Sequence, residues 1–155
     1  MATINQVLSQ LGLVLPPAPK PVASYVPYVQ TGNLVVISGQ LPSRSGQVAF
    51  TGKVISRADI ELGQQAARLA VINALAVLQD ACGGNLDRVQ RIVRLGIFVQ
   101  CVDTFDQQPA IANGASDLLV QIFGDKGRHA RAAVGVNALP LNALVEIEML
   151  AEITV

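Results

Sequence analysis

Side chains that can do chemistry gather near the end of the chain. Residues 127–150 read GRHARAAVGVNALPLNALVEIEML, in which the only histidine, His129, stands two residues before Arg131, and Glu146 and Glu148 follow. Their neighbours are mostly Ala, Val, Leu and Gly. A guanidinium group matches a carboxylate with two parallel hydrogen bonds, and a glutamate can hold a water molecule and pass a proton. This stretch is therefore a candidate site that could bind a small carboxylate beside a water molecule held by a glutamate.

The candidate residues lie in the two last predicted strands, about 130–137 and 143–154, which flank the sequence NALPLN. Alternate residues of a strand share a face. If the strands pair as an antiparallel hairpin, Arg131 and the two glutamates fall on the same face, whereas a slip of one residue separates them. An alternative interpretation is that Arg131 and Glu148 form a structural ion pair across the strands.

The pattern along the chain predicts an α+β fold. Apolar β-branched runs indicate strands, Ala- and Leu-rich runs indicate helices, and Gly or Pro separates them. The predicted order is β-β-α-β-α-β-β, a sheet with two helices on one face. The elements are a short helix at 3–12, an extended proline-rich segment at 16–21, strands at 33–40 and within 43–52, a helix at 59–81, a strand at 88–102 and a helix at 108–123.

The composition points to self-association. Apolar residues make up 51% of the 155 residues and charged residues only 14%, well under the roughly 25% of typical soluble domains. The strands supply apolar residues to both faces of the sheet, but the helices cover only one face. We therefore expect the other face to be buried between copies of the chain, because such interfaces resemble protein cores.

Several classes of function are disfavoured. Eleven basic and eleven acidic residues give no net charge, so there is no broad basic field for nucleic acid. The sequence has no apolar run long enough for a membrane span, no phosphate-binding loop, and no metal spacing around Cys82 and Cys101. With no positive charge before Lys20, a signal peptide is not expected. We expect a cytoplasmic protein with reduced, buried cysteines and neither metal nor cofactor.

Three features carry a family resemblance: SGQLP at 38–42, ARAAVGVNALPLNALVEIE at 130–148, and the order of the elements. Together they resemble the YjgF/Rid family, also named endoribonuclease L-PSP, in its longer YjgF-like branch. The resemblance covers roughly residues 22–154. It makes residues 1–21 an N-terminal extension and 22–155 the family domain.

The resemblance implies a chorismate-mutase-like fold in a homotrimer with three clefts between subunits. It also implies a hydrolase, an enamine/imine deaminase that converts reactive 2-imino acids to 2-oxo acids and ammonia in metabolite damage control. The arginine that grips the substrate carboxylate in the family falls on Arg131, and the glutamate that orients the hydrolytic water falls on Glu146.

Further site residues follow from the same resemblance. Ala133 takes the position whose backbone contacts substrate, where many members have cysteine, and Gly39 takes the position at the cleft wall. The cleft tyrosine of the family matches Tyr28 by context, although the spacing leaves Tyr25 as an alternative. A helix asparagine corresponds to Asn113.

Two other functions remain open from the sequence. One is a non-enzymatic trimeric module that binds a small carboxylate as a sensor or regulator, which would need Arg131 but not Glu146. The other is an endoribonuclease on single-stranded RNA, which the zero net charge and the scarcity of aromatic residues disfavour. His129 is expected to cap or flank a strand rather than to act as a base.

Overall fold

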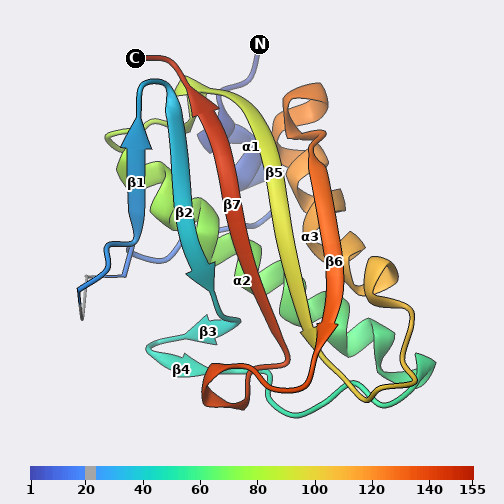
Figure 1. Ribbon diagram of the computed structural model, residues 1–155. Helices are drawn as coiled ribbons and strands as arrows, with labels where there is room; N and C mark the ends of the chain where they lie inside the picture. The colour runs from blue at the N-terminus through green and yellow to red at the C-terminus, as the bar shows by residue number, and fades with distance from the viewer. Residues whose placement is uncertain (20–23) are drawn as a thin grey trace.

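A five-stranded sheet with helices behind it forms the body of the chain (Figure 1). The computed structural model describes residues 1–19 and 24–155. The sheet has the order β1-β2-β7-β5-β6. Its strands are β1 (Tyr28–Thr31), β2 (Leu34–Gln40), β5 (Val89–Gln100), β6 (Ala130–Val136) and β7 (Val145–Ile153). The helices are α1 (Ile4–Gln10), α2 (Ile60–Ala81) and α3 (Gln108–Phe123), with single turns η1 (Arg57–Asp59), η2 (Leu86–Arg88), η3 (Gly124–Gly127) and η4 (Pro140–Asn142).

The α+β fold and both long helices are as the sequence predicts, but the first two strands differ. The strand predicted within 43–52 is a separate small hairpin below the sheet, formed by β3 (Ser43–Arg44) and β4 (Gln47–Val48). The missing sheet strand is β1, which pairs with β2 through a two-residue turn at Gly32 and Asn33. Gly32 has φ 60°, which a glycine adopts without steric cost in such a turn.

The predicted hairpin of the two last strands is wrong. β6 pairs in parallel with β5 at the edge of the sheet, and β7 lies between β5 and β2, antiparallel to both. The reason is the crossover: α3 carries the chain back along the sheet, so that β6 runs parallel to β5. Leu95 of β5 is opposite Arg131 on one side and Met149 on the other, so Arg131 faces the helices. The predicted proximity of Arg131 to the glutamates therefore does not occur within one chain.

The core lies between the sheet and the two long helices, which approach each other through glycines. A Cβ added at Gly114 of α3 would overlap the backbone carbonyl oxygen of Gln64 in α2. One added at Gly63 of α2 would overlap side-chain atoms of Ile111, the nearest at 2.6 Å. The two glycines thus set how closely the helices pack.

Gly114→Ala should lower the free energy of unfolding by about 1–3 kcal/mol despite the better helix propensity of alanine, because a backbone cannot move aside as a side chain can. Urea unfolding monitored by circular dichroism measures it. Gly63→Ala is the matched comparison and should cost less, since its Cβ meets side-chain atoms of the buried Ile111, which can shift further than a backbone can. Equal losses in both variants would contradict this account of the helix contact.

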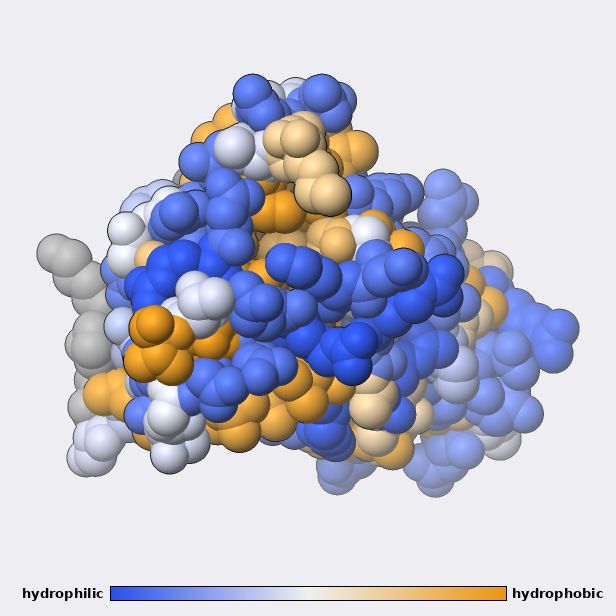
Figure 2. Space-filling view, turned by 90° about the horizontal axis from the view of Figure 1, so that it is seen from above, coloured by the Kyte–Doolittle hydropathy of each residue, from blue (hydrophilic) through white to orange (hydrophobic). Residues whose placement is uncertain are grey.

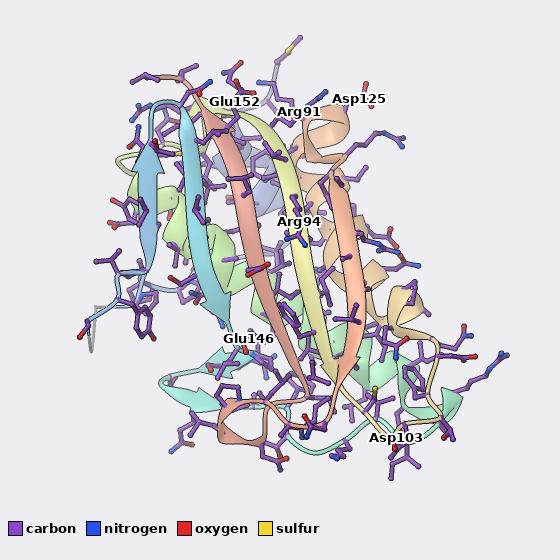
Figure 3. All side chains as sticks on the ribbon, viewed as in Figure 1. Arg91, Arg94, Asp103, Asp125, Glu146 and Glu152 are labelled. Carbon is purple, nitrogen blue, oxygen red and sulfur yellow. The ribbon has the colours of Figure 1, made fainter. Side chains whose placement is uncertain are left out.

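The face of the sheet away from the helices is open and carries exposed valines beside charged side chains. Val29, Val36 and Val134 on three different strands expose about half of their surface, at 54%, 48% and 46%. Near the middle lies Arg94, labelled in Figure 3, which forms an ion pair of 3.1 Å with Glu148. Hydrophobic side chains also reach the surface along the lower side of Figure 2, the side of this face. Within one chain the helices cover only one side of β5, and burial of the other side between copies stays a prediction.

The N-terminal helix packs onto the same core as the rest of the chain. Leu8 is buried, and the N–H of Ile4 donates to Asp87 Oδ1 at 2.7 Å. The predicted boundary at residues 21 and 22, and the end of the predicted proline-rich segment, lie outside the described residues. Among the described helices, none is both long and apolar enough to cross a membrane.

Candidate functional site

Glu146 and Gly39 lie side by side where β7 begins and β2 ends. Glu146 is half-buried on the open face, and Figure 3 shows it close to the end of β2. The pairing of β2 with β7 is irregular between Ile37 and Gln40, which places Gly39 against β7. A Cβ added at Gly39 would overlap Glu146 Oε1. The glycine of the SGQ sequence therefore provides the space that the carboxylate occupies.

A cavity of about 620 Å³ opens beside this pair. Its lining includes Tyr25, Gly39 and Glu146, together with Pro16 and Pro17 from the N-terminal segment. Asn73 of α2 fixes the loop after β2, since its amide donates to the carbonyls of Leu41 and Ser43 at 2.9 and 3.0 Å. The volume is that of a small-molecule site.

Tyr25 and Tyr28, the two candidates for the cleft tyrosine, have different surroundings. Tyr25 lines the cavity with Glu146. Tyr28 is opposite Ile37 in β2, on the helix side, and packs against the core. Only Tyr25 is brought together with Gly39 and Glu146.

The environment of Glu146 favours its protonated form. Burial raises the pKa of this carboxyl above its usual value, and the negative charge of Glu148 adds to the rise. Glu148 itself is paired with Arg94, not with Arg131. The alternative of an Arg131–Glu148 ion pair is therefore wrong. A carboxylate whose pKa is raised is a stronger proton acceptor than an ordinary glutamate, as a general base requires.

Arg131 lies at the opposite edge of the sheet, over the first half of α3. Its Nη1 donates to Asn113 Oδ1 at 2.8 Å and to Ser116 Oγ at 3.0 Å, and its Nη2 donates to the carbonyl of Pro109 at 3.3 Å. Within the described part of the chain, Arg131 takes part in no ion pair. Asn113, the helix asparagine that the resemblance singles out, is thus a hydrogen-bond partner of Arg131.

Donors remain free on this edge. Three of the five guanidinium hydrogens are used, and no described residue accepts from Nε or from the second hydrogen of Nη2. The carbonyl of Val136 accepts from Cys101 of β5, so by alternation the backbone groups of Arg131 and Ala133 point to the free edge. The edge therefore offers a cation and an amide to an anion, although no carboxylate side chain occupies it.

His129 contacts both the turn before β6 and α3. Its Nδ1 lies 2.6 Å from the carbonyl of Gly127, and its Nε2 lies 2.9 Å from Ser116 Oγ. Sequence reasoning did not single out Ser116 or Pro109. Their spacing with Asn113, at i, i+4 and i+7, could have placed all three on one helix face.

The predicted site residues thus form two groups on opposite faces of the sheet. One contains Arg131, Ala133 and Asn113, on the helix side at the edge strand β6. The other contains Gly39 and Glu146 with Tyr25, where β2 ends. Within one chain, the cation and the general-base candidate belong to separate half-sites.

Comparisons with known proteins agree with this fold and these sequences. Residues 5–153 match the YjgF/chorismate mutase-like family, whose description also carries the endoribonuclease label. Protein TCP17 of Trypanosoma cruzi is 43% identical over 147 residues, 94% of this chain and 91% of that protein. A 2-iminobutanoate/2-iminopropanoate deaminase of Dermatophagoides farinae is 35% identical over 133 residues, 86% and 88% of the two chains.

A solved structure supports the same assignment. The Atu1372 protein of Agrobacterium tumefaciens, described as of unknown function, superposes with a TM-score of 0.90 at 45% identity, covering 97% of this chain and 92% of that chain. The sequence match spans almost the whole chain, and so does the structural one. The chain belongs to the YjgF/Rid family.

Proposed function

We propose that the protein hydrolyses 2-imino acids and their enamine tautomers to 2-oxo acids and ammonia. The observation that carries the proposal is the exposed fork of Arg131, which is held by three hydrogen bonds from one side and has no carboxylate partner among the described residues. A two-point fork of this kind matches the carboxylate of an imino acid. The 35% identity to a 2-iminobutanoate/2-iminopropanoate deaminase supports the same reaction.

The proposal requires a second copy of the chain. Arg131 and Glu146 lie on opposite faces, so a complete site needs the Arg131 half of one subunit against the Glu146 half of another. A closed ring of three copies gives three such clefts, each with the same two halves. The open sheet face, with Val29, Val36 and Val134 exposed, supports an extensive apolar contact between the copies.

The reaction then needs only placement and proton transfer. Arg131 and the Ala133 amide hold the substrate carboxylate, which fixes the adjacent carbon of the protonated imine. Glu146 accepts a proton from a water molecule as its oxygen bonds to that carbon, giving an amino alcohol. The proton then passes from Glu146 to the nitrogen. As the C–N bond breaks, the hydroxyl gives its proton to Glu146 and becomes the carbonyl, so that ammonia leaves and a 2-oxo acid remains.

We propose a cytoplasmic, protective role for this activity. Cys82 and Cys101 are both buried and unpaired, which is typical of proteins in a reducing compartment. Imines of amino acids also react in water without an enzyme, so a modest acceleration suffices to limit their lifetime.

A carboxylate-binding module without turnover is the second candidate, since the fork of Arg131 serves binding equally well. Glu146 favours the enzyme, because its carboxyl has a raised pKa and lines a cavity. An endoribonuclease is the weakest candidate, because zero net charge gives the chain no broad basic field to attract RNA.

Arg131→Ala should abolish imine hydrolysis, with kcat/KM about 100-fold lower, because the reacting carbon is no longer fixed. In the measurement, an amino-acid oxidase releases imines in the presence of semicarbazide, and active enzyme lowers the amount of semicarbazone formed. The matched control is Arg128→Ala, which removes an exposed arginine paired with Asp125 at 3.3 Å. It should keep wild-type activity. Equal semicarbazone with and without the wild-type protein would contradict the proposal for the imines used.

A further inference from the structure

The single histidine of the chain is held in one tautomer by its two contacts. The carbonyl of Gly127 can only accept a hydrogen bond, so Nδ1 of His129, 2.6 Å away, must carry the proton. In the neutral ring, Nε2 then has a free lone pair. Among the described residues its hydrogen-bond partner is the hydroxyl of Ser116, at 2.9 Å, which must therefore donate its proton to His129.

This arrangement fixes the direction of the Ser116 hydroxyl. With its proton committed to His129, Ser116 Oγ can offer only lone pairs to Arg131 Nη1, 3.0 Å away. A serine hydroxyl on its own can rotate and present either a proton or a lone pair. A chain of three hydrogen bonds thus runs from the guanidinium of Arg131 through the Ser116 hydroxyl and the His129 ring to the carbonyl of Gly127. Each group donates to the next.

The neutral form of His129 is also the favoured one. Burial lowers the pKa of His129, the positive charge of Arg131 lowers it further, and the hydrogen bond to Gly127 opposes them. Two charged residues, Arg128 and Asp125, lie close to His129 in the sequence. Both are exposed, and they form an ion pair with each other. From α3, the packed neighbour of the ring is the uncharged Ser116.

We infer that His129 and Ser116 are positioning residues for Arg131, which hold its guanidinium so that the Nε side of the fork faces the free edge of β6. Asn113 and Pro109 take two further hydrogens, but an amide side chain and one long contact of 3.3 Å leave rotation about Nε–Cζ open. The hydrogen bond that Ser116 Oγ accepts from Arg131 Nη1 prevents this rotation. The effect on substrate binding rests on the proposed function, whereas the hydrogen-bonded connection from Gly127 to Arg131 does not.

Nuclear magnetic resonance tests the connection without any substrate. The chain has one histidine, so long-range ¹H–¹⁵N spectra at about pH 8 report its tautomer unambiguously. We expect Nδ1 to be protonated and Nε2 not. We also expect separate Nη1 and Nη2 signals for Arg131, which merge through faster rotation in Ser116→Ala and His129→Leu but not in His129→Gln, whose Oε1 still accepts from Ser116. A ring protonated at Nε2, or an Arg131 rotation unchanged by Ser116→Ala and His129→Leu, would overturn the inference.

Affinity tests the consequence. The dissociation constant of 2-oxobutanoate, a product of the proposed reaction, should rise about tenfold in Ser116→Ala and His129→Leu, and stay near the wild-type value in His129→Gln and in the control Arg128→Ala. Partial unfolding lowers the amount of protein that can bind but leaves the dissociation constant unchanged. Thermal unfolding measures the stability of each variant separately. Raised values in all four variants, or in none, would overturn the positioning role. If the wild type binds no 2-oxo acid, the proposed function fails, and the tautomer and rotation still decide the inference.

Discussion

A mixture of Arg131→Ala and Glu146→Gln should recover activity that neither variant has alone. Each variant lacks one half of every site, and both should be at least 100-fold less active than wild type. If the protein is the proposed trimer, unfolding and refolding the two chains together gives trimers of mixed composition. A cleft is complete when the subunit that contributes Arg131 carries the Glu146→Gln change and its neighbour carries the Arg131→Ala change. Random assembly makes about one cleft in four complete, so about a quarter of wild-type activity should return.

The controls for this mixing experiment separate assembly from chemistry. Each variant refolded alone, and the two mixed after refolding without exchange of subunits, should remain inactive. The mass of the refolded particles, measured by light scattering, should be that of three chains in all cases. If mixed particles form but remain inactive, the site is not shared between copies and the proposed arrangement of the cleft is wrong.

Gly39→Ala should inactivate the protein and destabilise it. The Cβ would overlap Glu146 Oε1, so the carboxylate has to leave the position at which it would hold water. We expect a loss of about 1–3 kcal/mol in the free energy of unfolding, which is the usual cost of overpacking, and turnover lower by about 100-fold. Gly39 has no left-handed φ, so its backbone accepts alanine and the effect arises from the contact alone.

A double variant isolates that contact. In a Glu146→Ala background, the same Gly39→Ala change meets no carboxylate and should cost little further stability. Urea unfolding of the four proteins of the cycle gives the coupling energy. A loss from Gly39→Ala that is equally large in both backgrounds would show that the glycine is needed for the bulge in β2 and not for Glu146.

Local sequence signals were sufficient to predict the helices. α3 spans residues 108–123 as predicted, because Pro109 suits a first helical turn and Gly124, with φ 61°, ends the helix. β1 was not predicted, because its four residues YVQT have too little alternation to indicate a strand. Short strands of this kind depend on their partner, here β2, more than on their own sequence.

The pairing order could not be predicted, because it is a property of the whole sheet. The alternation of residues 145–153 correctly put Glu146 and Glu148 on one face, as Phe98 and Gly96 opposite them confirm. The alternation in β7 is compatible with either β6 or β5 as its neighbour in the sheet. Consecutive strands are usually expected to pair as a hairpin. The closeness of Gly39 to Glu146 likewise follows from the irregular pairing of β2, which no short motif encodes.

The cavity beside Glu146 has an unusual wall. Pro16, Pro17 and Pro19 all line it, and each proline ring fixes the backbone angle φ near −65°. A flexible loop loses about 1–2 kcal/mol of conformational entropy per residue when a ligand immobilises it. These prolines have already lost much of that freedom in the unliganded chain. A ligand entering the cavity therefore meets a wall that is close to its bound form, so the entropy of binding should resemble that of a rigid cleft and not that of a closing loop.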